Sequence, residues 1–282
     1  MSKILVTGAA GFLGKSVSEY FSNKGHEVFP LTRKELDVTN KNQVTDWFAK
    51  NKVDFVIHTA VKGGRRGEYD GFSDYVANIK MFENLFENKH KFSMMIHFGS
   101  GAEFDRKNHI NCYEEDRVFD SMPEDFYGLS KNMIARKILK HKTNIYNFRL
   151  FGCFGKNEED NRLLKILSNG IIEQSETFIE GSKSMDFFYD MDVCRAIEFY
   201  MNNYNKVNLP RDVNLVYEDK FTIKEISDHL EKVLGKINRN LKLNEITTNS
   251  YTGDWKLCSK TFPEDLFIGL KQAISKIYSV EG

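Results

Sequence analysis

The first fourteen residues constrain the fold more than any other stretch of the chain. Ile4, Leu5 and Val6 form a short apolar run, and three glycines follow it with the spacing Gly-x-x-Gly-x-x-Gly. A buried strand that turns sharply into a helix needs glycine there, because glycine adopts positive φ and allows backbones to approach closely. The motif therefore predicts a strand–turn–helix unit whose helix N-terminus binds the pyrophosphate of a dinucleotide.

The turn supplies the first expected cofactor-binding residues. Gly8 is expected to make the turn, Gly11 to let the backbone approach the pyrophosphate, and Gly14 to let the helix pack closely on the strand. The same pattern can be an ordinary structural turn, but its position directly after an N-terminal strand favours dinucleotide binding. The residues expected to contact the cofactor here are Gly8, Gly11, Phe12, Leu13 and Gly14.

The end of the second expected strand, at residues 27–31, indicates which dinucleotide is bound. NAD-binding units of this kind usually have an acidic residue there, which holds the ribose 2′-hydroxyl. This chain has Thr32 and Arg33 instead, a hydroxyl and a cation suited to a 2′-phosphate. We therefore expect NADP(H) rather than NAD(H); the alternative is that Arg33 is an ordinary solvated arginine.

Strand-like apolar runs alternate with helical spacing along the first half of the chain. Such regular crossovers predict an α/β protein of the Rossmann type, a doubly wound parallel sheet. Residues 1–155 are expected to form the NADP-binding domain, with a returning segment near 185–206. Residues 156–282 are expected to form mainly a smaller α/β substrate-binding region.

The composition of the chain indicates which kinds of binding partner to expect. The 282 residues include 40 Lys and Arg against 40 Asp and Glu, so net charge gives no reason to bind nucleic acid or an anionic membrane. No apolar run approaches a membrane span or a signal-peptide core. The four cysteines lack CxxC spacing, and we expect neither a metal site nor a disulfide framework. A cytoplasmic protein with a small-molecule partner is the expectation.

Tyr127 and Lys131 are the expected catalytic pair, with Ser100 as third member. The tyrosine and lysine are spaced i and i+4, one turn apart on one helix face. An ammonium near a phenol lowers the pKa of the phenol, which would let Tyr127 exchange a proton near neutral pH. Ser100 follows an earlier expected strand and can hydrogen-bond the same substrate oxygen. Together they predict a proton relay for a carbonyl that accepts hydride from a nicotinamide.

The Tyr-x-x-x-Lys spacing occurs a second time, at Tyr20 and Lys24. That copy lies on the first expected helix, away from the carboxyl ends of the later strands. We therefore expect Tyr20 to pack and Lys24 to be solvated. The alternative for Tyr127 is a surface tyrosine that has a lysine neighbour by chance.

The glycine motif, Ser100 and Tyr127-x-x-x-Lys131 together resemble the extended short-chain dehydrogenase/reductase family, the NAD-dependent epimerase/dehydratases. The resemblance implies a nucleotide-diphosphate sugar as substrate, with the nucleoside diphosphate held by the C-terminal region. It also implies a homodimer formed through the helices that flank Tyr127. The further cofactor contacts expected are Asp37 near the adenine, Val38, Thr59, Ala60 and Lys131.

Residues 36–39 and 58–64 look like the corresponding segments of GDP-L-fucose synthase and its relatives, which reduce 4-keto-6-deoxy sugars with NADPH. Those enzymes also epimerise, using a cysteine two residues beyond the serine and a later histidine. Here Ala102 takes the cysteine position, and Asn161 and Arg162 stand near the histidine position. The resemblance therefore implies simple C4 reduction, with epimerisation as the alternative.

The expected substrate-binding side chains are Lys62, Arg162 and Lys183. Many family members have an arginine that binds the nucleotide where this chain has Met185, and Lys183 or Arg162 would replace it; solvated loop residues are the alternative. The dehydratases of the family place Asp-Glu directly after the catalytic threonine, whereas Gly-Ala follows Ser100 here, which argues against dehydration. A non-catalytic NADP-binding sensor on the same scaffold is the remaining alternative.

Overall fold

The larger lobe is built on a parallel sheet. The structure, a computed structural model, describes residues 1–65, 67–244 and 249–279. Within them, the strands of this sheet are β1 (Lys3–Thr7), β2 (Glu27–Leu31), β3 (Phe55–His58), β4 (Met94–Ser100), β6 (Ile145–Leu150) and β10 (Asp212–Asn214). Their order is β10-β6-β4-β3-β1-β2, and every neighbouring pair is parallel. The doubly wound fold class expected from the sequence is confirmed.

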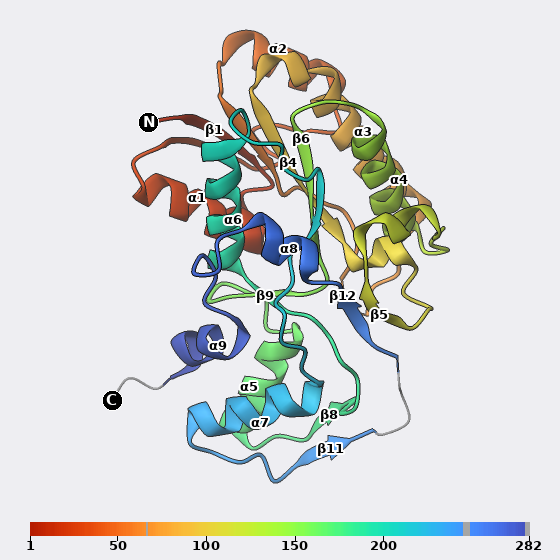
Figure 1. Ribbon diagram of the computed structural model, residues 1–282, viewed down its shortest axis with the longest axis vertical. Coiled ribbons are helices and arrows are strands. Elements are labelled where there is room, and N and C mark those ends of the chain that lie inside the picture. Colours follow the sequence, from red (N-terminus) through yellow and green to blue (C-terminus); the bar gives the residue numbers. More distant parts are fainter. Residues whose placement is uncertain (66, 245–248, 280–282) are drawn as a thin grey trace.

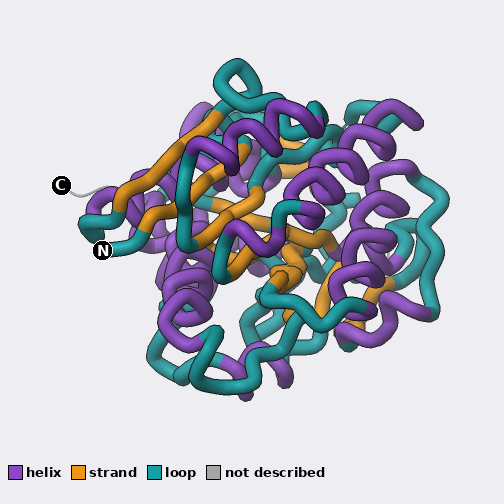
Figure 2. Tube along the Cα trace, turned by 90° about the horizontal axis from the view of Figure 1, so that it is seen from above, coloured by secondary structure: helices purple, strands orange, loops and turns teal. Residues whose placement is uncertain are grey.

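Helices cover both faces of this sheet (Figures 1 and 2). One face carries α1 (Phe12–Asn23) and α6 (Asp190–Asn203); the other carries α2 (Lys41–Lys50), α3 (Phe72–Glu87) and α4 (Phe126–Lys140). Because both faces are covered, β3 and β4 are buried along their whole length, which explains their continuous apolar runs. In the part of the chain described, no helix is both long and apolar enough to cross a bilayer.

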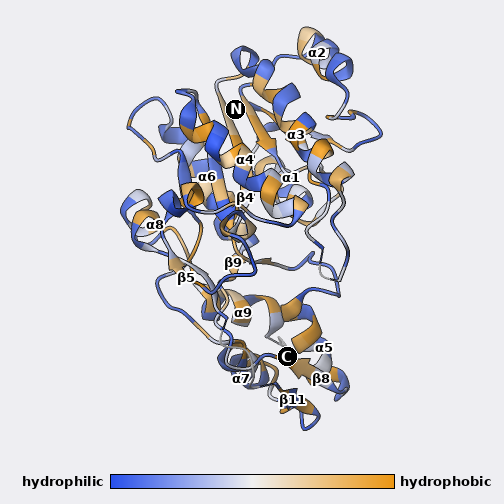
Figure 3. Ribbon diagram, turned by 90° about the vertical axis from the view of Figure 1, so that its right-hand side faces the viewer, coloured by the Kyte–Doolittle hydropathy of each residue, from blue (hydrophilic) through white to orange (hydrophobic). Residues whose placement is uncertain are grey.

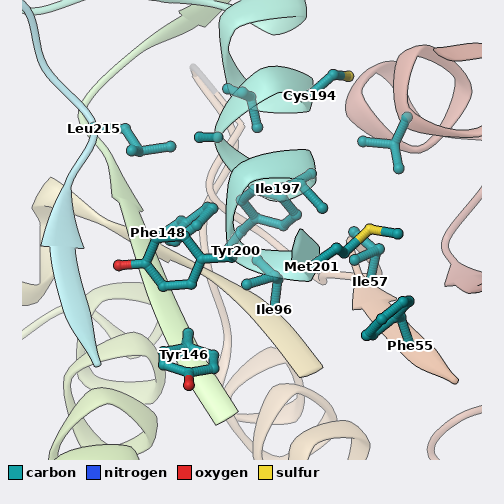
Figure 4. Close-up of a cluster of buried hydrophobic side chains, with 14 of the residues drawn as sticks. Phe55, Ile57, Ile96, Tyr146, Phe148, Cys194, Ile197, Tyr200, Met201 and Leu215 are labelled. Atoms are coloured by element: carbon teal, nitrogen blue, oxygen red, sulfur yellow. The ribbon is translucent and has the colours of Figure 1, made fainter. Parts of the chain in front are cut away.

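Aromatic side chains fill the space between the sheet and α6 (Figure 4). The ring of Tyr200 on α6 lies edge-on to Phe148 and Tyr146 of β6, with centroids 4.7 and 5.0 Å apart. Its hydroxyl donates to the carbonyl of Pro210 over 2.9 Å, so the polar end of the buried phenol is satisfied. Helix α6, which comes from the second half of the chain, thus packs on a sheet formed mainly by the first half.

A smaller lobe lies below the sheet lobe in Figures 1 and 3. Its elements are α5 (Leu163–Glu173), β8 (Thr177–Ile179), α7 (Ile223–Leu234), β11 (Leu241–Leu243) and α9 (Leu270–Tyr278). Helix α7 begins with a capping box, in which the Thr222 side chain accepts from Glu225 N–H and the Glu225 carboxylate accepts from Thr222 N–H.

Two short parallel pairs join the lobes. One pairs β7 (Cys153–Phe154) with β9 (Phe188–Tyr189), and the other pairs β5 (Ile110–Tyr113) with β12 (Tyr251–Gly253). The second pair brings residues near position 251 beside the turn that follows β4, and no local sequence pattern indicates this.

The C-terminal helical region is interrupted. Apolar spacing over residues 262–278 predicts one closing helix, but the structure has α8 (Lys256–Thr261), an irregular stretch, and then α9. Phe262 is extended, as expected for a residue before proline, and its ring packs against Tyr200 with a centroid distance of 5.7 Å. Tertiary packing of this phenylalanine therefore overrides the helical pattern.

A fully buried arginine connects two neighbouring strands, β6 and β10, to the turn after β4. The Nη2 atom of Arg149 on β6 lies 2.6 Å from Oε2 of Glu103 and 2.5 Å from Oδ2 of Asp212 on β10. Its Nη1 donates to Asn214 over 2.9 Å. Burial raises the pKa of both carboxyls, and the guanidinium opposes that shift. Each charge in this buried trio therefore needs the others.

For Arg149→Met we expect the free energy of unfolding to fall by about 3–5 kcal/mol near neutral pH, because two buried carboxylates lose their counter-charge. The loss should shrink on acidification. Without the guanidinium, which opposes the rise in the pKa of Glu103 and Asp212, the folded variant takes up protons at a higher pH than the unchanged protein does. Urea unfolding at neutral and at mildly acidic pH measures the effect, with the exposed Arg117→Met as control. A loss no larger than that of the control would contradict the account.

Candidate functional site

A cleft of about 1650 Å³ lies along the carboxyl ends of the central strands and is lined by residues of both lobes. The strand order reverses beside β1, because the chain passes from β1 to β2 at one edge and returns to β3 on the other side. Open α/β sheets bind ligands at such a point. All the residues that the sequence assigned to the cofactor, the catalytic group or the substrate line this cleft: Gly8, Gly11, Phe12, Leu13, Gly14, Thr32, Arg33, Asp37, Val38, Thr59, Ala60, Lys62, Ser100, Tyr127, Lys131, Arg162 and Lys183.

The glycine turn has the conformation its sequence requires. Gly8 has φ 70°, and a Cβ there would lie 2.6 Å from Cα of Ala60. A Cβ at Gly14 would lie 2.8 Å from Cα of Ala9, so this glycine allows α1 to pack on the turn. Gly11 caps α1 without a side-chain hydrogen bond, which leaves the helix N-terminus open toward the cleft. The turn can therefore receive an anionic group.

The end of β2 holds an acidic side chain that the sequence analysis missed. The Glu35 carboxylate accepts from the backbone N–H of Thr32 over 2.8 Å and also from its hydroxyl. Arg33 is 71% exposed, and its Nε lies 3.5 Å from Oδ2 of Asp37. The cation is thus accessible to a ligand phosphate, whereas the Thr32 hydroxyl is already engaged. A Thr-x-x-Glu capping pattern could have revealed Glu35.

Tyr127 and Lys131 lie on the first turns of α4, beside the end of β4. The helix begins where the Asp125 side chain accepts from Gly128 N–H over 2.7 Å. The Nζ atom of Lys131 donates to the carbonyl of Phe98 over 2.6 Å and lies 5.8 Å from the centroid of the Tyr127 ring. The i, i+4 spacing thus places both side chains at one strand end.

The pKa of Tyr127 differs in direction from the sequence expectation. Loss of solvent raises it, while a hydrogen bond with Ser100 and the charge of Arg106 partly oppose that shift. Burial lowers the pKa of Lys131 to about 8, against the attraction of Glu103. The expected lowering of the phenol pKa by Lys131 is therefore wrong for this structure, because desolvation outweighs the nearby positive charge.

Ser100 is the last residue of β4 and is buried. Its N–H donates to Oε1 of Glu103 over 2.9 Å, and its Oγ accepts from Ala102 N–H over 3.2 Å. The buried trio around Arg149 thus fixes the backbone of this serine through Glu103. The side chain of Ser100 hydrogen-bonds Tyr127, so serine and tyrosine meet as the sequence predicts.

Three further residues near the phenol were not among the site residues expected from the sequence. The guanidinium of Arg106 lies 5.6 Å from the centroid of the Tyr127 ring and donates to Asp125 over 2.7 Å. Gly64 has φ 74°, and a Cβ there would lie 2.6 Å from the Tyr127 ring. Asn78 on α3 holds the loop before Gly64 by bonding both backbone groups of Lys62. The glycine pair at 63–64 was the one hint of close packing.

The expected substrate residues lie farther along the same cleft. Arg162 precedes α5, and its charge partly opposes the rise in the pKa of Tyr127. Lys183 pairs with Glu180 over 3.3 Å, and Lys62 lies 4.0 Å from Asp74. Both lysines are therefore close to a carboxylate on the cleft wall.

Tyr251 of β12 is a further cleft residue that the sequence analysis missed. A hydrogen bond joins its side chain to Ser100, and a Cβ on Gly101 would lie 2.8 Å from its ring carbon Cζ. It lies 151 positions after Ser100 and reaches the site through the β5–β12 pair, so neither motif nor periodicity could have identified it.

Comparison with known proteins gives a family match across most of the chain. The model of the NAD dependent epimerase/dehydratase family matches residues 4–215. GDP-L-colitose synthase from Yersinia pseudotuberculosis is 25% identical over 256 residues, which are 83% of this chain and 82% of that protein.

Solved structures share the fold over nearly the whole chain. A GDP-mannoheptose C4 reductase from Campylobacter jejuni with NADP bound has a TM-score of 0.79 and 22% identity, covering 98% of this chain and 97% of that one. The Bordetella bronchiseptica enzyme WbmG in complex with NAD and UDP has a TM-score of 0.81 and 17% identity, covering 97% and 92%. At these identities the likeness shows the fold alone.

The burial of Lys131 can be tested by NMR titration of the lysine side chains. One side chain should titrate near pH 8, because loss of solvent lowers its pKa to about 8, whereas ordinary lysines titrate at about 10.4. The signal should vanish in Lys131→Met and persist in Lys137→Met, a change on the same helix. If no lysine titrates below about pH 10, the ammonium is not desolvated as described.

Proposed function

The chain belongs to the NAD dependent epimerase/dehydratase family, and from this premise we propose that it is an NADPH-dependent reductase of a nucleotide-linked 4-keto-6-deoxy sugar. The observation that carries the proposal is the meeting of Ser100, Tyr127 and Lys131 in the cleft that the glycine turn also lines. The similarity to GDP-L-colitose synthase supports the substrate class.

The cofactor fits the groups at one end of the cleft. The open N-terminus of α1 suits a pyrophosphate, and the exposed Arg33 suits a 2′-phosphate. Asp37 and Val38 would lie near the adenine, with Thr59 and Ala60 beside the turn. When bound, NADPH supplies the hydride that the C4 carbon of the sugar accepts.

The three catalytic side chains supply the proton that the reduction needs and stabilise the group that has lost it. Tyr127 donates its hydroxyl proton to the developing alkoxide, and Ser100 hydrogen-bonds the same oxygen. Reduction needs the phenol in its protonated form, which is the form that burial favours. Lys131, held by the Phe98 carbonyl, stabilises the phenolate once the proton has left and contacts the cofactor ribose.

In this proposal different parts of the chain bind the cofactor and the substrate. Residues 1–155, with the returning segment near 185–206, bind the cofactor. Residues 156–282 bind mainly the substrate. Arg162, Lys183 and, from the sheet lobe, Lys62 line the cleft and would bind the substrate diphosphate.

The homodimer stays a prediction. Helices α3 and α4 carry an aromatic group on their outer side, formed by Phe72, Tyr75 and Phe126. Phe72 is 61% exposed. Apolar side chains at such a surface are typical of a contact with a second subunit.

An epimerase that recycles its hydride is the alternative from the same family. Epimerisation at a carbon beside the carbonyl needs an acid and a base, and the cysteine position holds the buried Ala102. Glu158 lines the cleft, and burial raises its pKa to about 7. Its carboxylate, however, accepts from the N–H groups of Gly155 and Lys165, over 3.3 and 3.2 Å, which favours a structural role. Reduction alone is therefore the better proposal.

Assay of NADPH consumption against a panel of nucleotide-linked 4-keto-6-deoxy sugars tests the function. We expect turnover with at least one sugar, and a loss of about 10³-fold or more in Tyr127→Phe, because that variant has no proton to donate. NADPH affinity should survive in the variant, and Tyr20→Phe, the second copy of the motif, should retain activity. Retention of most of the activity by Tyr127→Phe would refute its role. If no sugar consumes NADPH, the sensor alternative is favoured.

Arg33→Ala tests the choice of cofactor. We expect about 10-fold or greater weakening of NADPH binding and little change for NADH, because only NADPH carries the phosphate that the guanidinium would bind. Binding is measured by titration of the nicotinamide fluorescence, with Lys34→Ala as the neighbouring control. Equal weakening for both cofactors, or tighter NADH binding by the unchanged protein, would contradict the assignment.

A further inference from the structure

Ser100 lies between two phenols in the cleft. Its side chain hydrogen-bonds Tyr127 from α4 and Tyr251 from β12. Both tyrosines are half-buried and line the cleft. One hydroxyl group therefore connects the proposed proton donor to a second tyrosine that comes from the far end of the sequence.

Tyr251 is held in place by backbone and ring contacts. Its N–H donates to the carbonyl of Ser184 over 2.8 Å, and its carbonyl accepts from Asp186 N–H over 3.2 Å. Its ring lies edge-on to Phe151, with the centroids 5.2 Å apart. The position of the tyrosine ring is thus set by the backbone of residues 184–186 and by a buried aromatic ring.

The hydrogen-bonding capacity of Ser100 decides the direction of these bonds. A serine hydroxyl has one hydrogen to donate and two lone pairs that accept. The N–H of Ala102 already occupies one lone pair. One lone pair is therefore left, so only one of the two phenols can donate to Ser100. The serine hydrogen is then free to be donated to the other phenol or to the substrate.

The proposed reaction settles which phenol donates. Tyr127 must donate its hydrogen to the sugar oxygen, so it cannot donate the same hydrogen to Ser100. The remaining lone pair is then filled by Tyr251, and burial keeps this phenol protonated by raising its pKa well above the ordinary value. The serine hydrogen is left to point at the oxygen of Tyr127 or of the substrate.

We propose that Tyr251 is a positioning residue for the proposed reduction: its hydroxyl donates to Ser100 and so directs the serine hydrogen toward the reacting oxygen. No covalent step involves Tyr251, which keeps its proton throughout. This inference rests on the proposed function, because it assumes that Tyr127 is the proton donor.

Kinetics of Tyr251→Phe with NADPH and the sugar that the panel identifies provide the test. We expect kcat to fall about tenfold, with little change in KM or in NADPH affinity, because one oriented hydrogen bond that acts on the developing charge is lost. In a Ser100→Ala background the same substitution should add less than about twofold, because the hydroxyl through which it acts is gone. Thermal melting verifies that each variant is folded.

Tyr113→Phe is the matched control, since this tyrosine lies in the same two-stranded sheet but does not line the cleft. Its kcat should stay within about twofold of the unchanged protein. A Tyr251→Phe variant with unchanged kcat, or one whose effect multiplies fully with Ser100→Ala, would overturn the inference. That result alongside an inactive Tyr127→Phe would remove only the role of Tyr251, whereas an active Tyr127→Phe would remove the proposed function itself.

Discussion

Loss of solvent at the carboxyl end of β4 is the constraint on which the site depends. Burial raises the pKa of Tyr127 and lowers that of Lys131 to about 8, so each side chain is shifted toward its neutral form. The phenol therefore keeps the proton that a reduction consumes, while the lysine retains most of its charge near neutral pH. In the same low-dielectric surroundings, the charge of Arg106 acts more strongly on the phenol than it would in water.

The buried trio connects this site to the stability of the fold. Arg149 lies between Glu103 and Asp212, and Glu103 also accepts from the backbone of Ser100. Burying three charges is costly, and their pairing offsets that cost only while the geometry is kept. The trio that joins β6 to β10 thus also holds the serine that stands between the two phenols, so folding and the proposed chemistry use the same network.

The features that could be predicted from the sequence are those that depend on residues close together in the chain. The strand–turn–helix unit at Gly8 and the single-turn spacing of Tyr127 and Lys131 are fixed by neighbours along the chain, and both lie where expected. Tyr251 could not be predicted, because its contact with Ser100 depends on a strand pairing across the whole chain. The direction of the Tyr127 pKa was also out of reach, since it depends on burial rather than on which charges are nearby in sequence.

Transfer of deuterium from NADPH that carries deuterium at both positions of the nicotinamide C4 tests the central claim most directly. If the phenol and the glycine turn serve one reduction, the product should carry the label at sugar C4, as read by NMR, with one oxidised cofactor formed for each labelled sugar. A product without the label, or one formed with no net oxidation of NADPH, would contradict the account and favour a recycled cofactor.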